Sequence, residues 1–403
     1  MDDAPTSTAV ADRRAAPPRV KLVLALLPMG ALMLSLSRGK TLDFDIYRNA
    51  LIAMLHGQSV YTYKMYWDAG HVWLGFLYPP FAALLMSPFA LLPRTPGVMI
   101  LALLTALLVV ASLVVLVETI NGRRAHDGAS TIGPLKVVVV ATPLALALPT
   151  ISNMALGQVS FALWALVLLD VIVLPPRWKG LLVGLAGAIK LTPMILVPYY
   201  LVTRQWRPAI TSTAAFVAAT LVGAVFRWSD TLTYWLHPSV IDSSLGNLAR
   251  VDNWSIYGSL ARLSVGGTAL TLTWLALSAG VGLGALWRAR RHHLTGEEPE
   301  AAVVMGLAAS LVSVATWPHH LLFLVVAIAL LAWQRPLLGV PTLLLAVLPA
   351  LASLAGLPPV PQSLEGHVAV VFMVIVVLAG LPTAGGARRE RRAERAEPSM
   401  AGR

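Results

Sequence analysis

The sequence predicts an all-α, polytopic integral membrane protein. Of its 403 residues, 57% are hydrophobic and only 12% are charged, whereas soluble domains usually carry about 25% charged residues. Apolar runs recur along nearly the whole chain, which distinguishes a protein embedded in the membrane from a soluble domain held by a single anchor. Most of the chain is therefore expected to face lipid or other helices rather than water.

The apolar runs predict about twelve membrane-spanning helices. Ten runs cover residues 20–37, 97–119, 136–150, 158–175, 208–226, 266–288, 300–317, 319–334, 336–353 and 367–384. Residues 179–204 form one longer apolar region that is broken at Lys190-Leu-Thr-Pro193. Because proline ends or kinks a helix, we expect two short spans to meet at this break.

Basic residues place the N-terminus in the cytoplasm, because cytoplasmic loops carry an excess of Lys and Arg. With this orientation the cytoplasmic loops contain Arg123, Arg124, Arg177, Lys179, Arg204, Arg207, Arg288, Arg290, Arg291 and Arg335. The agreement requires residues 79–93 to be a re-entrant or interfacial segment, since this proline-bounded run is too short to span easily. The first extracytoplasmic loop is also basic, but long loops follow the rule poorly.

This topology divides the chain into a membrane domain with two polar tails. The expected parts are a disordered cytoplasmic tail at 1–18, a transmembrane domain at 19–385 with extracytoplasmic loops at 38–96 and 227–265, and a basic cytoplasmic tail at 386–403. The first loop contains a helical-looking stretch from Ile46 to Leu55 and is rich in aromatic residues. Such aromatic residues are typical of an interfacial belt, and a sugar-binding platform would look the same.

Composition and motifs argue against several classes of protein. The chain has no cysteine, so disulfides, iron–sulfur clusters and thiol chemistry are ruled out. Its net charge of +11 is not carried by a soluble basic domain, and we expect no nucleic-acid partner. The GxxxxGK[ST], GxGxxG, GxSxG and HExxH patterns are missing, which argues against an ATP-driven pump.

Six polar motifs fall on the extracytoplasmic side of this topology. They are Asp43 with Asp45, Tyr78-Pro-Pro80, Gly157-Gln-Val-Ser160, Lys190-Leu-Thr-Pro193, Asp252 to Gly258, and Trp317-Pro-His-His320. Polar and ionisable groups at membrane depth are costly and tend to face a cavity. The gathering of these motifs on one face therefore predicts one polar cavity there. A transporter would instead need charges near the middle of the bilayer.

Each candidate reactive group has a structural alternative. Asp43 and Asp45 follow the first span and are either solvated loop residues or a general base at the mouth of the cavity. Lys190 either extends its amine to the membrane surface or supplies a point charge for a phosphate. His319 and His320 would point about 100° apart on a helix, so we expect one ring to face the cavity and disfavour a zinc pair. The alternative is that both rings are merely interfacial.

In this order, the motifs resemble those of bacterial polyprenol-phosphate-sugar-dependent glycosyltransferases of the GT-C superfamily. More narrowly, the chain resembles the actinobacterial α-1,2-mannosyltransferases that act on phosphatidylinositol mannosides and lipomannan. The matching stretches are Asp43-Phe-Asp-Ile-Tyr47, Tyr78-Pro-Pro-Phe-Ala82, Gly157-Gln-Val-Ser160, Gly180-Leu-Leu-Val-Gly184 through Lys190-Leu-Thr-Pro193, Asn253-Trp-Ser255 with Gly258, and Trp317-Pro-His-His320. The chain departs from the family pattern at Ser160, Trp254 and Thr316, where the family commonly has Asn, Gln and Ser.

The resemblance implies a role for each candidate. Asp43 matches the presumed catalytic base, with Asp45 as the runner-up or as a partner that raises the pKa of Asp43, and His319 and His320 are further catalytic candidates. The departing phosphate needs cationic or N–H partners, for which the candidates are Lys190, Arg250 and His320. The expected acceptor- or sugar-binding residues are Tyr47, Tyr78, Gln158, Asn253, Trp254 and Trp317. We expect no metal and no cofactor.

The predicted function is therefore inverting transfer of mannose from a polyprenyl-phosphate donor to a lipid-linked mannoside, through an α-1,2 linkage. The expected partners are this donor, a glycolipid acceptor and membrane lipids, and the expected location is the plasma membrane with the active site on the extracytoplasmic face. One alternative is an arabinofuranosyltransferase of the same fold. More distant alternatives are a lipid or sugar transporter or flippase, and a non-catalytic scaffold of the cell envelope.

Overall fold

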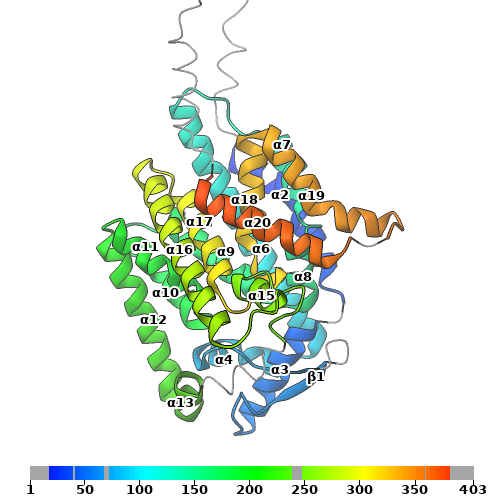
Figure 1. Cartoon of the computed structure of the whole chain (residues 1–403), viewed down its shortest axis with the longest axis vertical. Helices are drawn as coiled ribbons and strands as arrows, with labels where there is room; N and C mark the ends of the chain where they lie inside the picture. The colour runs from blue at the N-terminus through cyan, green and yellow to red at the C-terminus, as the bar shows by residue number, and fades with distance from the viewer. Residues whose placement is uncertain (1–17, 40, 68–71, 238–246, 359, 382–403) are drawn as a thin grey trace, which may run out of the picture.

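A computed structural model describes residues 18–39, 41–67, 72–237, 247–358 and 360–381. Helices dominate these residues, as the sequence predicts, and one short two-stranded hairpin accompanies them. The predicted tails at 1–18 and 386–403 lie outside the described residues, apart from Pro18. Figure 1 shows the helices packed into one bundle, with a smaller group of elements at its lower end.

Five helices among the described residues are long and apolar enough to cross a membrane. They are α2 (Arg19–Leu36), α6 (Arg94–His126), α12 (Trp206–Phe226), α16 (Gly267–Leu294) and α19 (Pro336–Leu354). A bent pair, α7 (Pro134–Leu144) and α8 (Leu148–Leu156), brings the number to six if it is one span. The multi-pass membrane architecture is confirmed at this level.

The bend between α7 and α8 corrects one predicted span. The sequence predicts one continuous helix over 136–150, but the two helices meet at an angle of 63°. Pro143 lies inside α7 and Pro149 lies in the first turn of α8. Proline lacks the N–H that a continuous helix needs and its ring crowds the preceding turn, so two prolines this close redirect the chain.

Shorter helices complete the bundle. They are α9 (Ser160–Val173), α10 (Leu181–Ile189), the 3-10 helix η2 (Thr192–Ile195), α11 (Leu196–Val202), α17 (Glu298–Val312), the 3-10 helix η3 (Pro318–His320), α18 (Leu322–Gln334) and α20 (Gln362–Ala379). Helices α17 and α18 are buried along most of their length. The predicted break is present, because α10 ends at Ile189 and Lys190 is extended before η2 begins.

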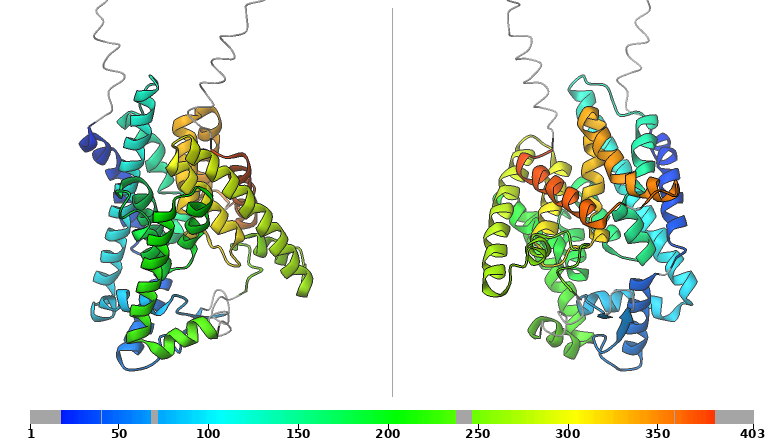
Figure 2. Two further views of the ribbon diagram at one scale, coloured as in Figure 1. Left: turned by 90° about the vertical axis from the view of Figure 1, so that its left-hand side faces the viewer. Right: turned by 45° about the vertical axis from the view of Figure 1, so that its right-hand side comes forward.

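A compact group of short elements covers the end of the bundle shown at the bottom of Figures 1 and 2. It consists of α3 (Leu42–Leu55), strands β1 (Lys64–Trp67) and β2 (Val72–Gly75), α4 (Pro80–Met86), α5 (Pro88–Leu91) and α13 (Trp228–Leu236). Helix α15 (Ile256–Arg262) instead packs against α16 and α17. The strands pair antiparallel, with Lys64 opposite Gly75 and Trp67 opposite Val72. The predicted helical stretch from Ile46 to Leu55 is confirmed and begins earlier, at Leu42.

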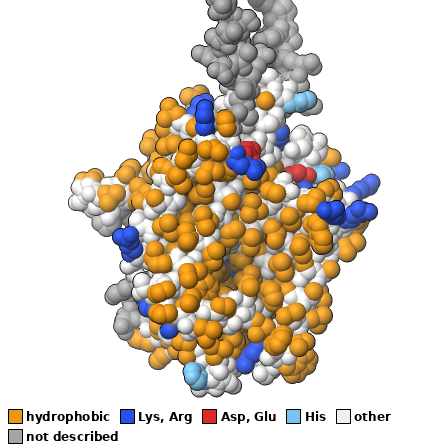
Figure 3. Space-filling view, turned by 180° about the vertical axis from the view of Figure 1, so that it is seen from behind, with side chains coloured by type: hydrophobic (Ala, Val, Ile, Leu, Met, Phe, Trp, Pro, Cys, Tyr) orange, Lys and Arg blue, Asp and Glu red, His pale blue; other side chains and the backbone are white. Residues whose placement is uncertain are grey.

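The outer surface of the bundle is apolar. Hydrophobic side chains cover most of the face in Figure 3, and Lys and Arg side chains are scattered mainly toward its edges. Large side chains such as Leu107, Ile210 and Leu283 are more than half exposed. A soluble protein rarely exposes such a large apolar area, so this surface fits contact with lipid.

Candidate active site

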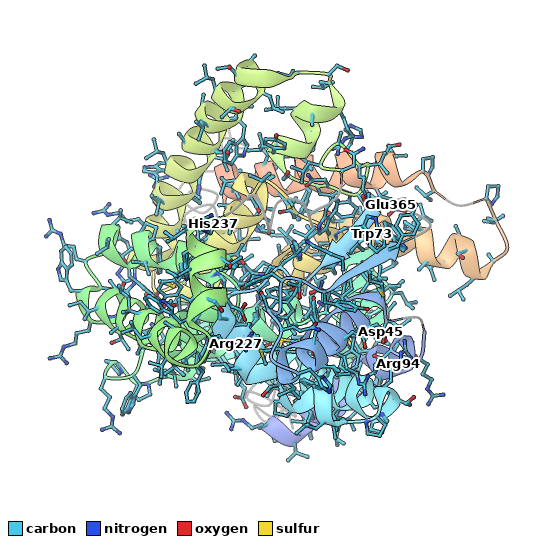
Figure 4. All side chains as sticks on the ribbon, turned by 90° about the horizontal axis from the view of Figure 1, so that it is seen from below. Asp45, Trp73, Arg94, Arg227, His237 and Glu365 are labelled. Atoms are coloured by element: carbon cyan, nitrogen blue, oxygen red, sulfur yellow. The ribbon has the colours of Figure 1, made fainter. Side chains whose placement is uncertain are left out.

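A cavity of about 730 Å³ lies among α3, the hairpin, α8, the Lys190 break and η3. Its charged and strongly polar lining residues are Asp43, Gln158, Lys190, Arg250, Asp252, His319 and His320. Apart from Arg250, these residues come from five of the six polar motifs, and Tyr78 adds the remaining motif. The predicted convergence on one polar cavity is therefore present. Figure 4 shows this end of the molecule from below.

Close packing around Phe44 positions Asp43. The Phe44 side chain is fully buried, and the backbones of Gly97 and Gly157 approach it so closely that a Cβ atom on either glycine would lie 2.7 Å from it. Gly157 also ends α8 in the left-handed conformation, with φ of 70°, which glycine adopts without strain. The turn at Gly157 delivers Gln158 directly to the Asp43 carboxylate.

The surroundings of the Asp43 carboxylate raise its pKa toward neutral pH. Gln158 Nε2 donates a hydrogen bond of 2.7 Å to Asp43 Oδ2. Burial raises the pKa of Asp43 to about 6, although the Gln158 hydrogen bond and the charge of Lys190 act in the opposite direction. Burial disfavours the charged form, and a base works best when its pKa lies near the working pH.

Two tyrosines continue this hydrogen-bonded group away from the carboxylate. Tyr78 Oη lies 3.0 Å from Gln158 Oε1, and Tyr47 Oη lies 2.9 Å from Tyr78 Oη. Both tyrosines are buried and pack edge-on against Phe76. The residues expected to touch sugar at Tyr47, Tyr78 and Gln158 thus bond one another.

Asp45 lies outside the cavity lining, although it is only two residues from Asp43. Arg94 binds both of its oxygens, at 2.7 and 2.9 Å, and also donates to Thr41 Oγ1. Figure 4 shows Asp45 and Arg94 side by side. On a helix, residues two apart point in different directions, so the first turn of α3 sends one carboxylate into the cavity and the other to Arg94.

Both His319 and His320 line the cavity. Their rings are perpendicular, with centroids 4.5 Å apart. The sequence predicts that one ring faces the cavity while the other packs or meets a backbone group, and the His320 ring meets the backbone N–H of Trp317. The Trp317 backbone N–H donates to His320 Nδ1 at 3.4 Å, and Asn153 Nδ2 donates to the His319 carbonyl at 3.1 Å.

Lys190 reaches the cavity from the break after α10. Its ammonium donates to Ser160 Oγ at 3.0 Å and lies 5.6 Å from the centre of the Tyr78 ring. Its positive charge interacts electrostatically with Asp43, His319 and His320. The neighbouring Ser160, where the sequence departs from the family pattern, is therefore the neutral partner that holds this lysine.

Arg250 lines the same cavity, but its guanidinium forms an ion pair with the Asp252 carboxylate. Its Nε and Nη2 atoms donate to the two oxygens of Asp252, at 2.9 and 2.6 Å. The guanidinium lies 4.6 Å from the Trp67 ring centre and 5.7 Å from that of Trp317. Asp252 opens one of the six polar motifs, whereas Trp67 carries no signal of its own in the sequence, because it is one aromatic residue of many in the first loop.

Asn253 and Trp254 are buried behind the cavity wall and do not line the cavity. Asn253 Oδ1 accepts from the Thr316 backbone N–H, and its Nδ2 donates to the carbonyls of Leu248 and Val314. The Trp254 backbone N–H also donates to the Thr316 carbonyl. These bonds tie the loop before α15 to the irregular segment that leads into η3.

Fold and cavity together define a polytopic membrane protein with a polar cavity near one end of its bundle. The chain belongs to glycosyltransferase family 87, whose profile matches residues 76–318. A Mycobacterium tuberculosis protein named polyprenol-phosphate-mannose-dependent alpha-(1-2)-phosphatidylinositol mannoside mannosyltransferase is 33% identical over 307 residues, which cover 73% of this chain and 71% of the relative. The Mycolicibacterium smegmatis protein of the same name is 32% identical over 320 residues, with the same coverage.

A second kind of relative differs in the acceptor that its name states. A Mycobacterium tuberculosis phosphatidylinositol pentamannoside mannosyltransferase is 28% identical over 343 residues, which cover 80% of this chain and 75% of the relative. The resemblance seen in the motifs is confirmed by these matches. The protein is a membrane glycosyltransferase.

Proposed function

We propose that this enzyme transfers mannose from a polyprenyl-phosphate-mannose donor to a phosphatidylinositol mannoside or lipomannan acceptor, forming an α-1,2 linkage with inversion. The observation that carries the proposal is the Asp43 carboxylate, which shares one cavity with the Lys190 ammonium and two histidines. The names of the relatives support the donor and the class of acceptor.

The chemistry requires one proton transfer and one exchange of bonds at the anomeric carbon. Asp43 removes the proton of the acceptor hydroxyl while that oxygen bonds to the anomeric carbon and the bond from this carbon to the phosphate oxygen breaks. The electron pair leaves with the polyprenyl phosphate, and the proton remains on Asp43. The departing phosphate monoester is a stable anion, so it needs electrostatic partners rather than a general acid.

Lys190 is the cation that we assign to the donor phosphate. It has a neutral partner in Ser160, so its charge remains available, and His319 and His320 add ring nitrogens beside it in the lining. Arg250 is instead assigned to the acceptor end, because Asp252 offsets its charge. Asp45, bound to Arg94, is assigned to holding the first turn of α3.

The acceptor end is assigned to the rim where Trp67 and Trp317 flank Arg250. Indole rings offer a flat apolar face with a polar edge, and sugars present both apolar C–H faces and hydroxyl groups. Asn253 and Trp254 do not contact the acceptor in this assignment, and they stabilise the cavity wall through their bonds to Thr316. We further propose that the cavity opens to the extracytoplasmic side of a bundle of about twelve spans. The basic last turns of α6 and α16, at the other end of the bundle in Figure 2, support this orientation.

Transfer of labelled mannose in membranes that contain the enzyme tests this function. Asp43→Asn removes the proton acceptor and is expected to lower the transfer rate at least ~100-fold. Asp45→Asn is the matched control, because it makes the same chemical change on the same helix turn outside the cavity. Transfer at the wild-type rate by the Asp43→Asn variant would disprove the assignment of the base.

The alternative donor needs its own comparison. Polyprenyl-phosphate-arabinose is offered to the wild-type enzyme beside polyprenyl-phosphate-mannose, with phosphatidylinositol mannoside as the acceptor. Faster transfer of arabinose would favour the arabinofuranosyltransferase. Movement of the labelled lipid across the membrane without any glycosidic product would favour a flippase.

A further inference from the structure

Four side chains form one continuous hydrogen-bonded row that ends on the Asp43 carboxylate. The row runs from Tyr47 through Tyr78 and Gln158 to Asp43, with distances of 2.9, 3.0 and 2.7 Å. We infer that this row has one fixed donor direction, from Tyr47 toward Asp43, and that Tyr78 and Gln158 are positioning residues for the base. The inference rests on the proposed function, in which Asp43 removes the acceptor proton.

The direction follows from counting donors and acceptors, starting at the carboxylate. Ionised Asp43 can only accept, so the amide group of Gln158 must turn its NH₂ toward it. Gln158 then presents its oxygen to Tyr78, and an amide oxygen can only accept, so the Tyr78 hydroxyl must donate to it. Because a hydroxyl has a single hydrogen, Tyr47 must be the donor to Tyr78.

Burial makes this row hard to replace. The exposed fractions of Tyr47, Tyr78 and Gln158 are 4%, 5% and 7%. An unpaired polar group in such a place is destabilising, so each member is held by the next one. Without the Tyr78 hydroxyl, Gln158 would lose the partner that distinguishes its oxygen from its nitrogen. Its amide could then rotate and turn the oxygen toward Asp43.

The row also selects the oxygen that takes the proton. Oδ2 of Asp43 accepts from Gln158 both before and after proton transfer, so the acceptor proton goes to Oδ1. A rotated Gln158 would place two acceptors against each other and favour protonated Asp43. The row therefore keeps the base ionised between turnovers.

Several other charged and titratable groups face the cavity around Asp43, including Tyr234 from α13. Lys190 faces it from the break after α10, and His319 and His320 face the same cavity from η3. Asp45 of α3 is bound to Arg94. Arg250 and Asp252 also line the cavity and neutralise each other.

Tyrosine-to-phenylalanine substitutions test the inference through the pH profile of transfer. Tyr78→Phe is expected to move the acidic limb of kcat/KM upward by about one pH unit, because Gln158 is then free to rotate and its hydrogen bond to the charged form of Asp43 is lost. Tyr47→Phe should move the limb less, since Tyr78 can still donate to Gln158. Tyr61→Phe is the matched control, because Tyr61 donates to the backbone oxygen of Tyr78 and lies outside the row.

The row also predicts how two substitutions combine. Gln158→Leu should move the limb in the same direction as Tyr78→Phe, and adding Tyr78→Phe to Gln158→Leu should move it no further. A Tyr78→Phe variant that is slower at every pH with an unmoved limb would overturn the inference. The proposed function would survive that result as long as Asp43→Asn remains inactive.

If Tyr78→Phe transfers mannose too slowly to measure, infrared spectroscopy can follow the protonation of Asp43 directly. The band of the protonated Asp43 carboxyl is obtained by subtracting the spectrum of Asp43→Asn from that of the variant at each pH. We expect this band to persist to higher pH in Tyr78→Phe than in the wild type and in Tyr61→Phe. Identical titrations in all three proteins would refute the inference.

Discussion

The cavity contains two carboxylate–cation pairs that are built in opposite ways. Arg250 and Asp252 bind each other directly through two hydrogen bonds, and their side chains keep 28% and 18% of their surface exposed. Asp43 and Lys190 instead each bond a neutral side chain: Asp43 accepts from Gln158, and Lys190 donates to Ser160.

The difference supports the proposed roles, in which Asp43 and Lys190 serve the reaction and Arg250 serves the acceptor end. An ion pair whose members satisfy each other has little charge left for a substrate, and Arg250 is further occupied by two indole rings. Asp43 and Lys190 retain acceptor and donor capacity that faces the same cavity. Neutral partners hold them in place without neutralising them, which is what a proton acceptor and a phosphate-binding cation require.

Of the substitutions that test this difference between the two pairs, Lys190→Met is expected to have the largest effect on activity. It removes the charge of Lys190 and keeps the length of the side chain. We expect kcat/KM for the donor to fall about 100- to 1,000-fold, as when one donor to a developing anion is removed. Lys136→Met, in the exposed first turn of α7, is the control for the loss of one lysine. Similar losses in both variants would show that Lys190 acts through stability alone.

A moderate effect is expected from pH in the wild-type enzyme. The pKa of Asp43 is raised to about 6 by burial, and only the ionised form accepts a proton. Activity should therefore rise with pH through about 6 and fall about tenfold for each unit below it. The measurement is kcat/KM across the mildly acidic to mildly basic range, and a limb near the ordinary carboxyl pKa of about 4 would contradict the buried base.

The smallest effect is expected from Asp252→Asn, which releases the charge of Arg250. If the guanidinium serves the acceptor end, the KM for the acceptor should fall by up to about tenfold, because Asp252 no longer offsets the charge of Arg250. The KM for the donor should stay within about twofold. A clear fall in the KM for the donor would instead show that Arg250 reaches the phosphate.

Some of the site follows from the sequence because its groups lie in short motifs at the ends of apolar runs. The cost of burying Lys190 or Asp43 in lipid is a property of the residue and its neighbours, so these positions stand out in the linear chain. The break at Lys190-Leu-Thr-Pro193 was predictable for the same local reason, since proline cannot continue the helix. Asn253 and Trp254 belong to a matching motif too, yet they build the wall and not the lining.

The sequence by itself determined the membrane class, the helical fold, the polar break and the group of motifs on one face, because these depend on composition and local backbone chemistry. Only the tertiary structure decided which carboxylate enters the cavity. Asp43 and Asp45 are identical in chemistry, and the direction of each depends on the phase of α3 and on Arg94, 49 residues away. The pairing of Arg250 with two tryptophans and the row from Tyr47 to Asp43 also join distant segments, which no local pattern specifies.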